Sequence, residues 1–404
     1  MQVSQVDSVT TQGAVKPTTS RFNSIDALRG FAAAAVVLYH LWNRFYPHLS
    51  TQSRALDLPG GGGWTFWLSF PLQYGYAGVT LFFVVSGFCI HWPQARNNAR
   101  TGMDGLSLRD FVWRRFWRLY PPYFASLVFS SLALGIFPLL LAITRAQTMN
   151  WGHVFALKDA AINALFLQQI FPSSLGFNGV YWTLVYEVQF YLFYPLLLWA
   201  MRRSGKTVML VILLGCELLY TGWVRDFHWL HSIPFFFLGR YFEWYLGMYA
   251  AELVACSTTH PSHVTKVLVA AGGLALGIVT TFSTWLWPLR DLCLSIGFFG
   301  VLIIAITGSS STSYYSSVWA RVVRILGGVG LFSYSLYLIH VPVIDVAWNS
   351  LKLGVKYGWL SNRLMGWCAL LSVPFAFVTA YWFYRLIEKP SIRMAQSNQS
   401  SKAG

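Results

Sequence analysis

Charged residues are scarce in this sequence. Asp, Glu, Lys and Arg make up 11% of its 404 residues, whereas a soluble globular protein carries about 25%. Hydrophobic residues make up 55% of the chain and aromatic residues 18%, and apolar blocks near membrane-spanning length recur to its end. This composition excludes an ordinary soluble domain and predicts an all-α, polytopic integral membrane protein.

Cysteine is also sparse. The five cysteines, at positions 89, 216, 256, 293 and 368, form no CxxC motif and no Cys/His ligand spacing. That pattern excludes a disulfide framework and a structural zinc site, so we expect no metal. The sequence also lacks a G-x-S-x-G nucleophile motif and an evident cleavable signal peptide.

The apolar blocks predict about ten transmembrane helices, because a span needs roughly 20 mainly apolar residues. The candidate spans are 25–45, 74–92, 119–143, 180–201, 207–223, 232–254, 267–287, 291–308, 326–347 and 366–387. With the N-terminus in the cytoplasm, eighteen Lys and Arg residues fall in inner loops and tails and nine in outer loops. This bias follows the positive-inside rule and predicts that both termini are cytoplasmic.

The predicted organisation is one membrane domain with two short ends. Residues 1–21 are expected to be a disordered cytoplasmic tail, 22–390 the membrane domain and 391–404 a short cytoplasmic tail. The net charge is +15, and most of the Lys and Arg residues lie at the ends of the apolar segments. Anionic lipid and membrane topology explain that placement, so we expect the bilayer as a partner and no nucleic acid.

Among the ionisable residues inside the predicted spans, five are candidates for a functional site. Arg29 and His40 are eleven residues apart in "IDALRGFAAAAVVLYHLW", so they share one helix face at a separation of roughly 16 Å. Glu187, Arg240 and His340 fall at a depth similar to that of His40. Intramembrane ionisable groups usually face the bundle interior and mark functional sites. Simpler alternatives are a Glu187–Arg240 salt bridge, an interfacial Arg29 and a histidine that only packs.

A basic and aromatic segment precedes the third predicted span. In "LRDFVWRRFWRLYPPYF", Arg114, Arg115 and Arg118 alternate with Trp113, Phe116 and Trp117. Positive-inside charge with an interfacial aromatic belt is one explanation. A binding site for a phosphorylated molecule is another, because guanidinium groups bind phosphate oxygens in a bidentate manner.

Taken together, these motifs resemble those of the membrane-bound acyltransferase family 3. The resemblance covers roughly residues 22–390 and rests on six stretches, which are "IDALRG" with His40, "LFFVVSGF" at 81–88, "RRFWRLYP" at 114–121, "WTLVYEVQFYLFYP" at 182–195, "FSYSLYLIHVP" at 332–342 and "EKP" at 388–390. It implies about ten spans, acyl-coenzyme A as donor, and essential roles for Arg29 and His40. It also implies that Arg114, Arg115 and Arg118 form the basic motif and that Glu187 is the acid of the fourth span.

The resulting hypothesis is an O-acyltransferase, acting as an O-acetyltransferase, in the cell inner membrane. Acetyl-coenzyme A is the expected co-substrate, with no tightly bound cofactor, and the expected acceptor is a hydroxyl of a lipid-linked or envelope sugar. His40 is the predicted general base, with Glu187, Arg240 and His340 as further catalytic candidates. Arg29, Arg114, Arg115 and Arg118 are predicted to bind the coenzyme. A proton-coupled secondary transporter that uses the same His, Glu and Arg groups is the alternative.

Overall fold

The computed structural model of the chain describes residues 19–45, 70–102, 105–143, 157–168, 170–171, 178–223, 239–256, 261–283, 289–308, 317–361 and 370–400, together with 286, 365 and 368. All regular structure in these residues is helical, which confirms the all-α fold class. Residues 1–18 and 401–404 lie outside the described residues, so the disordered tail predicted for 1–21 stays a prediction.

The helices follow one another along the whole described chain. In order they are α1 (Thr19–Phe45), η1 (Phe70–Tyr76), α4 (Ala77–Thr101), α5 (Leu108–Ile143), α6 (Leu157–Ala164), η4 (Gly179–Tyr181), α7 (Trp182–Ser204), α8 (Lys206–Trp223), α9 (Tyr241–Cys256), α10 (His263–Thr281), α11 (Arg290–Gly308), α12 (Ser317–Gly330), α13 (Ser333–Lys356), α15 (Ser372–Phe383), η8 (Tyr384–Glu388) and α16 (Lys389–Ser400).

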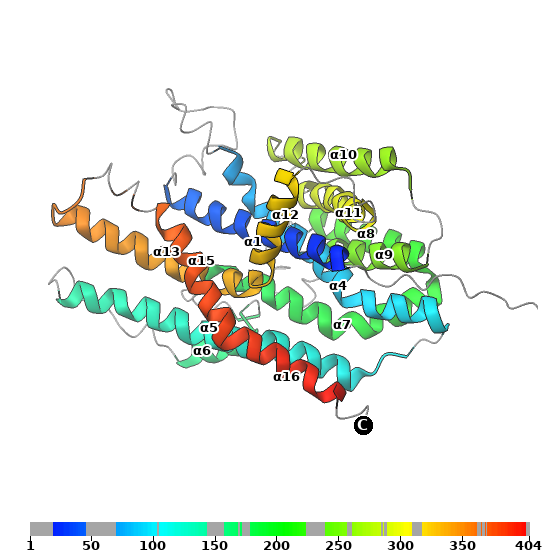
Figure 1. Ribbon diagram of the computed structural model, residues 1–404, viewed down its shortest axis with the longest axis horizontal. Helices are drawn as coiled ribbons and strands as arrows, with labels where there is room; N and C mark the ends of the chain where they lie inside the picture. Colours follow the sequence, from blue (N-terminus) through cyan, green and yellow to red (C-terminus); the bar gives the residue numbers. More distant parts are fainter. Residues whose placement is uncertain are drawn as a thin grey trace, which may run out of the picture.

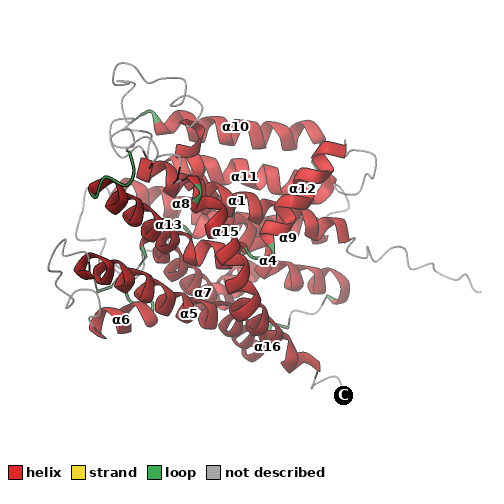
Figure 2. Ribbon diagram, turned by 60° about the vertical axis from the view of Figure 1, so that its left-hand side comes forward, coloured by secondary structure: helices red, strands yellow, loops and turns green. Residues whose placement is uncertain are grey.

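These helices form one bundle with α1 near its middle. Both views place α10 on one side of the bundle and α5 and α16 on the opposite side (Figures 1 and 2). The most extensive pairings are α4 with α9, α10 with α11, α1 with α12 and α13 with α15. Helix α1 also packs on α4, α11 and α13. The first apolar segment of the sequence is therefore a central helix rather than a peripheral anchor.

Each of the ten predicted spans overlaps a helix of the described chain. Within these residues, five helices are long and apolar enough to cross a membrane, and a sixth span is counted if the bent pair α12–α13 is taken as one. Helix α9 has only 16 residues, fewer than the roughly 20 that a span needs; the first part of its predicted span, 232–238, lies outside the described residues. The count of ten and the cytoplasmic termini stay predictions.

The predicted span 326–347 is broken between α12 and α13, which meet at an angle of 73°. Glycine is a poor helix former, and Gly327, Gly328 and Gly330 end α12. A Cβ on Gly330 would overlap the carbonyl oxygen of Asp26, so α12 crosses α1 closely only with glycine there. The Oγ of Ser333 donates a 2.9 Å hydrogen bond to the Gly330 carbonyl. The break places the N-terminus of α13 inside the bundle.

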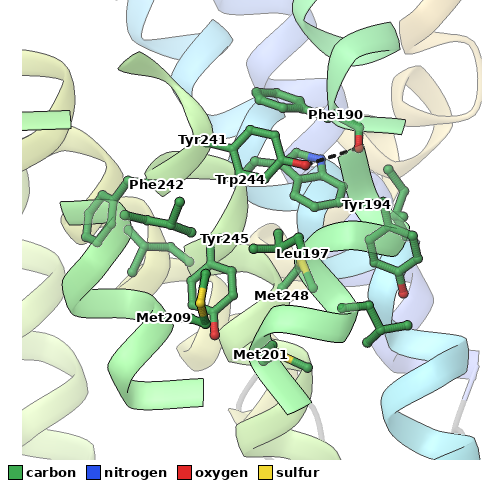
Figure 3. Close-up of a cluster of buried hydrophobic side chains, with 14 of the residues drawn as sticks. Phe190, Tyr194, Leu197, Met201, Met209, Tyr241, Phe242, Trp244, Tyr245 and Met248 are labelled. Atoms are coloured by element: carbon green, nitrogen blue, oxygen red, sulfur yellow. Dashed lines mark hydrogen bonds between the residues drawn. The ribbon is translucent and has the colours of Figure 1, made fainter. Parts of the chain in front are cut away.

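A cluster of buried aromatic and apolar side chains holds α7, α8 and α9 together (Figure 3). The rings of Phe190 and Trp244 stack with centroids 5.4 Å apart, and the Tyr241 hydroxyl donates to the Phe190 carbonyl at 3.3 Å. Trp244 also belongs to the crossing of α9 over α4, because a Cβ on Gly87 would overlap its carbonyl oxygen. Packing here fixes the position of α7, which carries Glu187 and other residues of the candidate site.

The last predicted span continues beyond its predicted end. Residues Tyr384–Glu388 form a π-helical turn between α15 and α16, and α16 extends to Ser400. A π-helical turn changes the direction in which the following side chains point, and such turns occur often at functional sites. Here the turn ends at Glu388, whose side chain is buried.

Candidate active site

Two histidines that are 300 residues apart in the sequence meet between α1 and α13. The Nδ1 of His40 lies 3.3 Å from the Nε2 of His340, and the ring centroids are 5.0 Å apart. The same Nδ1 of His40 is 2.9 Å from the Val36 carbonyl oxygen. The Nδ1 of His340 is 3.0 Å from the Leu336 carbonyl oxygen and 2.9 Å from that of Tyr337. His340 is fully buried, and His40 is partly exposed.

These contacts assign the tautomer of each neutral imidazole. Only an N–H can bond to a carbonyl oxygen, so the Nδ1 of His340 carries its proton and its Nε2 presents a lone pair. The N–H at Nδ1 of His40 then donates to the Val36 carbonyl and to His340. The Nε2 of His40 is therefore the unprotonated nitrogen and can accept a proton. The contacts with His340 and Val36 together fix the orientation of the His40 ring.

A cavity of about 340 Å³ opens among α1, α4, α5, α7 and α13. Its wall consists of Ile25, Asp26, Arg29, Val79, Phe82, Phe83, Val85, Ser86, Cys89, Ile90, Arg115, Arg118, Leu119, Thr183, Leu184, Glu187, Tyr191, Ser333, Tyr334 and Tyr337. A volume of this size is typical of small-molecule sites, and so is an apolar wall with a few charged groups. Neither His40 nor His340 is among the lining residues.

Three arginines from two helices converge on this cavity. Arg29 of α1 forms a 3.7 Å ion pair with Asp26, and Arg115 and Arg118 of α5 complete the set. The Arg115 guanidinium lies 5.4 Å from the centre of the Phe111 ring and 5.5 Å from that of the Tyr191 ring. Its Nε is buried and has no hydrogen-bond acceptor among the described residues. Arg114, the fourth predicted coenzyme-binding residue, does not line the cavity.

Glu187 shares the cavity with the arginines. Its carboxylate accepts a hydrogen bond from the Tyr191 hydroxyl, one helical turn away in α7. Together the lining residues supply three guanidinium groups and two carboxylates, those of Asp26 and Glu187. The orienting role predicted for Glu187 beside His40 stays a prediction.

Arg240 lies in a separate network of charges. It forms ion pairs with Glu243 at 2.6 Å and with Asp291 of α11 at 2.5 Å. Asp291 also pairs with Arg290 at 2.7 Å. Across the described part of the chain, the ion pairs of Arg240 do not include Glu187, and Arg240 does not line the cavity. The alternative of a Glu187–Arg240 salt bridge is therefore wrong, and the catalytic role of Arg240 stays a prediction.

Glu388, which the sequence reasoning did not single out, supports the site without lining the cavity. Its carboxylate accepts hydrogen bonds from the backbone N–H of Ser335 at 3.2 Å and from the Ser335 hydroxyl at 2.5 Å. It therefore caps the first turn of α13, where N–H groups have no partner inside the helix. Arg118 interacts with it electrostatically. The signal in the sequence was the acid of "EKP", directly after the last apolar segment.

Comparison with known proteins places the chain in a family. The acyltransferase domain model of acyltransferase family 3 matches residues 22–385. The chain belongs to acyltransferase family 3. No solved structure is significantly similar to it.

The chain is also similar to curated proteins along part or most of its length. Nodulation protein 10 of Rhizobium leguminosarum bv. viciae is 31% identical over 48% of this chain and 49% of its own length. Peptidoglycan O-acetyltransferase OatA of Listeria monocytogenes is 26% identical over 91% of this chain and 55% of its own length. Acyltransferase MdmB of Streptomyces mycarofaciens is 24% identical over 94% of this chain and 93% of its own length. The chain thus spans about half the length of the first two relatives, and its family and its long apolar helices indicate a multi-pass membrane protein.

Removing the carboxylate of Glu388 is expected to destabilise the fold. In Glu388→Ala, the first turn of α13 loses a cap and Arg118 loses a charge partner, so the free energy of unfolding falls by about 1–3 kcal/mol. Glu388→Gln keeps an acceptor oxygen and is expected to lose less. Chemical denaturation in detergent micelles measures the difference. Asp110→Ala removes a carboxylate near the surface in the first turn of α5 as a control, and an equal effect of the two alanine variants would contradict this role for Glu388.

Proposed function

We propose that the protein transfers an acetyl group from acetyl-coenzyme A to a hydroxyl of a lipid-linked or envelope sugar. The observation that carries the proposal is the alignment of two features of α1. Arg29 lies at the cavity, and about three turns further along the same helix the tautomer assignment leaves the Nε2 of His40 able to accept a proton. The arginines suit phosphate groups, and the histidine suits a hydroxyl.

The wall of the cavity has a basic part and an apolar part, which suit the two ends of the donor. Arg29, Arg115 and Arg118 supply bidentate donors for the phosphate oxygens of the coenzyme. The Nε–H of Arg115, which has no acceptor among the described residues, can donate to such an anion. Beyond them the wall is apolar, with Val79, Phe82 and Leu184, and suits an extended thioester arm. The nucleotide then lies at the arginines and the acyl end points toward Thr183 and Tyr337.

The proposed reaction needs one base. The Nε2 of His40 removes the proton of the acceptor hydroxyl as its oxygen attacks the thioester carbonyl carbon. The carbon–sulfur bond breaks, the coenzyme leaves as a thiolate, and the proton passes from His40 to that thiolate. The N–H at Nδ1 of His40 donates to His340 throughout, which stabilises the imidazolium between the two proton transfers.

The acceptor and the membrane are proposed from the relatives. The name of the Listeria relative states that it O-acetylates peptidoglycan, and we carry a sugar hydroxyl over to this chain as the acceptor class. A cytoplasmic thioester then requires the arginine end of α1 on the inner side of a bacterial inner membrane, with both termini in the cytoplasm. The Lys and Arg distribution supports this orientation.

The family membership favours acyl transfer over the proton-coupled transporter. The charged residues that the transporter alternative would use also lie in different surroundings from one another. Arg240 is held by Glu243 and Asp291, while Glu187 lies with the arginines of the cavity. Arg240 and Glu187 therefore belong to separate networks of charges.

Donor binding is expected to depend on Arg115 more than on its neighbour Arg114. Loss of a guanidinium–phosphate contact costs about 1.5–3 kcal/mol, so Arg115→Ala is expected to raise the Kd for coenzyme A roughly 10–100-fold. Arg114→Ala is expected to raise it less, because Arg114 does not line the cavity. Isothermal titration of the purified protein measures both, with the exposed Arg109→Ala on the same helix as control. Equal losses at 114 and 115 would contradict the cavity as the donor site.

Turnover is expected to require His40 and its orientation by His340. His40→Ala is expected to lower kcat about 10²–10⁴-fold, the usual contribution of a general base, while the Kd for coenzyme A stays within a few-fold. His340→Ala is expected to cost about 10–100-fold, as loss of an orienting partner does. His340→Gln restores an acceptor near the Nδ1 of His40 and is expected to recover part of kcat. Release of coenzyme thiol with a glycan acceptor measures kcat, and full turnover in His40→Ala would remove His40 as the base.

A further inference from the structure

The donor cavity ends one helical turn before the histidine pair. Tyr337 lines the cavity and precedes His340 by three residues on α13. Its ring lies 5.8 Å from the ring of Phe82, another lining residue, and 5.8 Å from the ring of His340 (centroid distances). The Tyr337 side chain therefore contacts both the cavity and the fully buried His340.

Two hydrogen bonds hold Tyr337 in this position. Its hydroxyl oxygen is 2.8 Å from the Oγ1 of Thr183 and 3.1 Å from the Val180 carbonyl oxygen. Val180 lies in η4 and Thr183 in the first turn of α7, and Asn178 ties that segment to α13 through a 2.8 Å hydrogen bond to the Leu338 carbonyl. The anchor is therefore part of the rigid bundle, whereas the tyrosine side chain can leave it by rotation about its own χ angles.

A separation of the cavity from His340 by the Tyr337 side chain matters for the function proposed above, and the inference rests on that proposed function. An acyl carbonyl must come within about 3–3.5 Å of the attacking atom to react, and the wall at Tyr337 prevents that while it is closed. His40, on the other side, is partly exposed. Water that His40 activates would hydrolyse an unprotected thioester, and enclosed sites suppress such side reactions.

We propose that Tyr337 is a positioning residue that separates the acyl-donor cavity from the His40–His340 pair, and that the acyl group reaches the pair only after the Tyr337 hydroxyl leaves Thr183 and Val180. In its closed position, Tyr337 limits hydrolysis of the donor in the absence of acceptor. In that side reaction the oxygen of water bonds to the acyl carbon, the carbon–sulfur bond breaks, and the proton passes through His40 to the coenzyme thiolate.

The first test measures thiol release from acetyl-coenzyme A without any acceptor. Tyr337→Phe and Thr183→Val each remove one anchoring hydroxyl and keep the volume of the side chain. A buried hydrogen bond contributes about 1 kcal/mol. In each variant the side chain at position 337 is therefore expected to leave its closed position roughly fivefold more often, and the rate of donor hydrolysis is expected to rise by the same factor. Adding His40→Ala to Tyr337→Phe is expected to remove that extra hydrolysis. Tyr123→Phe, which loses a buried hydroxyl bonded to the Asn163 carbonyl outside the cavity, is the matched control.

The second test needs no activity. Diethyl pyrocarbonate modifies neutral imidazoles, and peptide mass spectrometry reports its rate at His340. Opening of the wall is expected to speed that modification roughly fivefold in Tyr337→Phe and Thr183→Val, but not in Tyr123→Phe. Unchanged modification of His340 in both folded variants would overturn the partition. Absence of donor binding and turnover in the wild-type protein would overturn the proposed function instead, and the modification rate would still decide the role of Tyr337.

Discussion

The contact between the Nδ1 of His40 and the Nε2 of His340 is the constraint from which the rest of the site follows. An imidazole inside an apolar bundle is costly unless its nitrogens find partners. Here the two backbone carbonyls beside His340 fix its proton, His340 fixes the proton of His40, and the second nitrogen of His40 is left able to accept a proton. This arrangement of protons requires α13 to pack against α1 at the one relative position along the helix axes that brings His340 next to His40.

The break between α12 and α13 sets that register. Because α12 ends at Gly330 against the Asp26 carbonyl, α13 starts inside the bundle and needs a cap there. Glu388 supplies the cap from the π-helical turn near the end of the described chain. The same carboxylate interacts with Arg118, one of the arginines of the cavity. One buried acid thus links the position of the histidine pair to the basic end of the site.

Much of this could be predicted from the sequence, and the remainder has physical reasons. The spacing of Arg29 and His40 on one helix face follows from helical periodicity, and the helical fold follows from the apolar segments. Which of Arg114 and Arg115 faces the cavity depends on the rotation of α5, since neighbours on a helix point about 100° apart. The partners of Arg240 were not predictable, because similar depth in the membrane does not say which helices are neighbours. Glu388 was missed because a π-helical turn has no clear signature in a single sequence.

The measurement that tests the account most directly uses the thiol of Cys89, which lines the cavity. In a variant with Cys216, Cys256, Cys293 and Cys368 replaced by serine, the rate of Cys89 alkylation by N-ethylmaleimide is followed with and without acetyl-coenzyme A. If the cavity binds the donor, saturating acetyl-coenzyme A slows the alkylation of Cys89. An unchanged rate, with the donor shown to be bound, would contradict the claim that this cavity is the donor site.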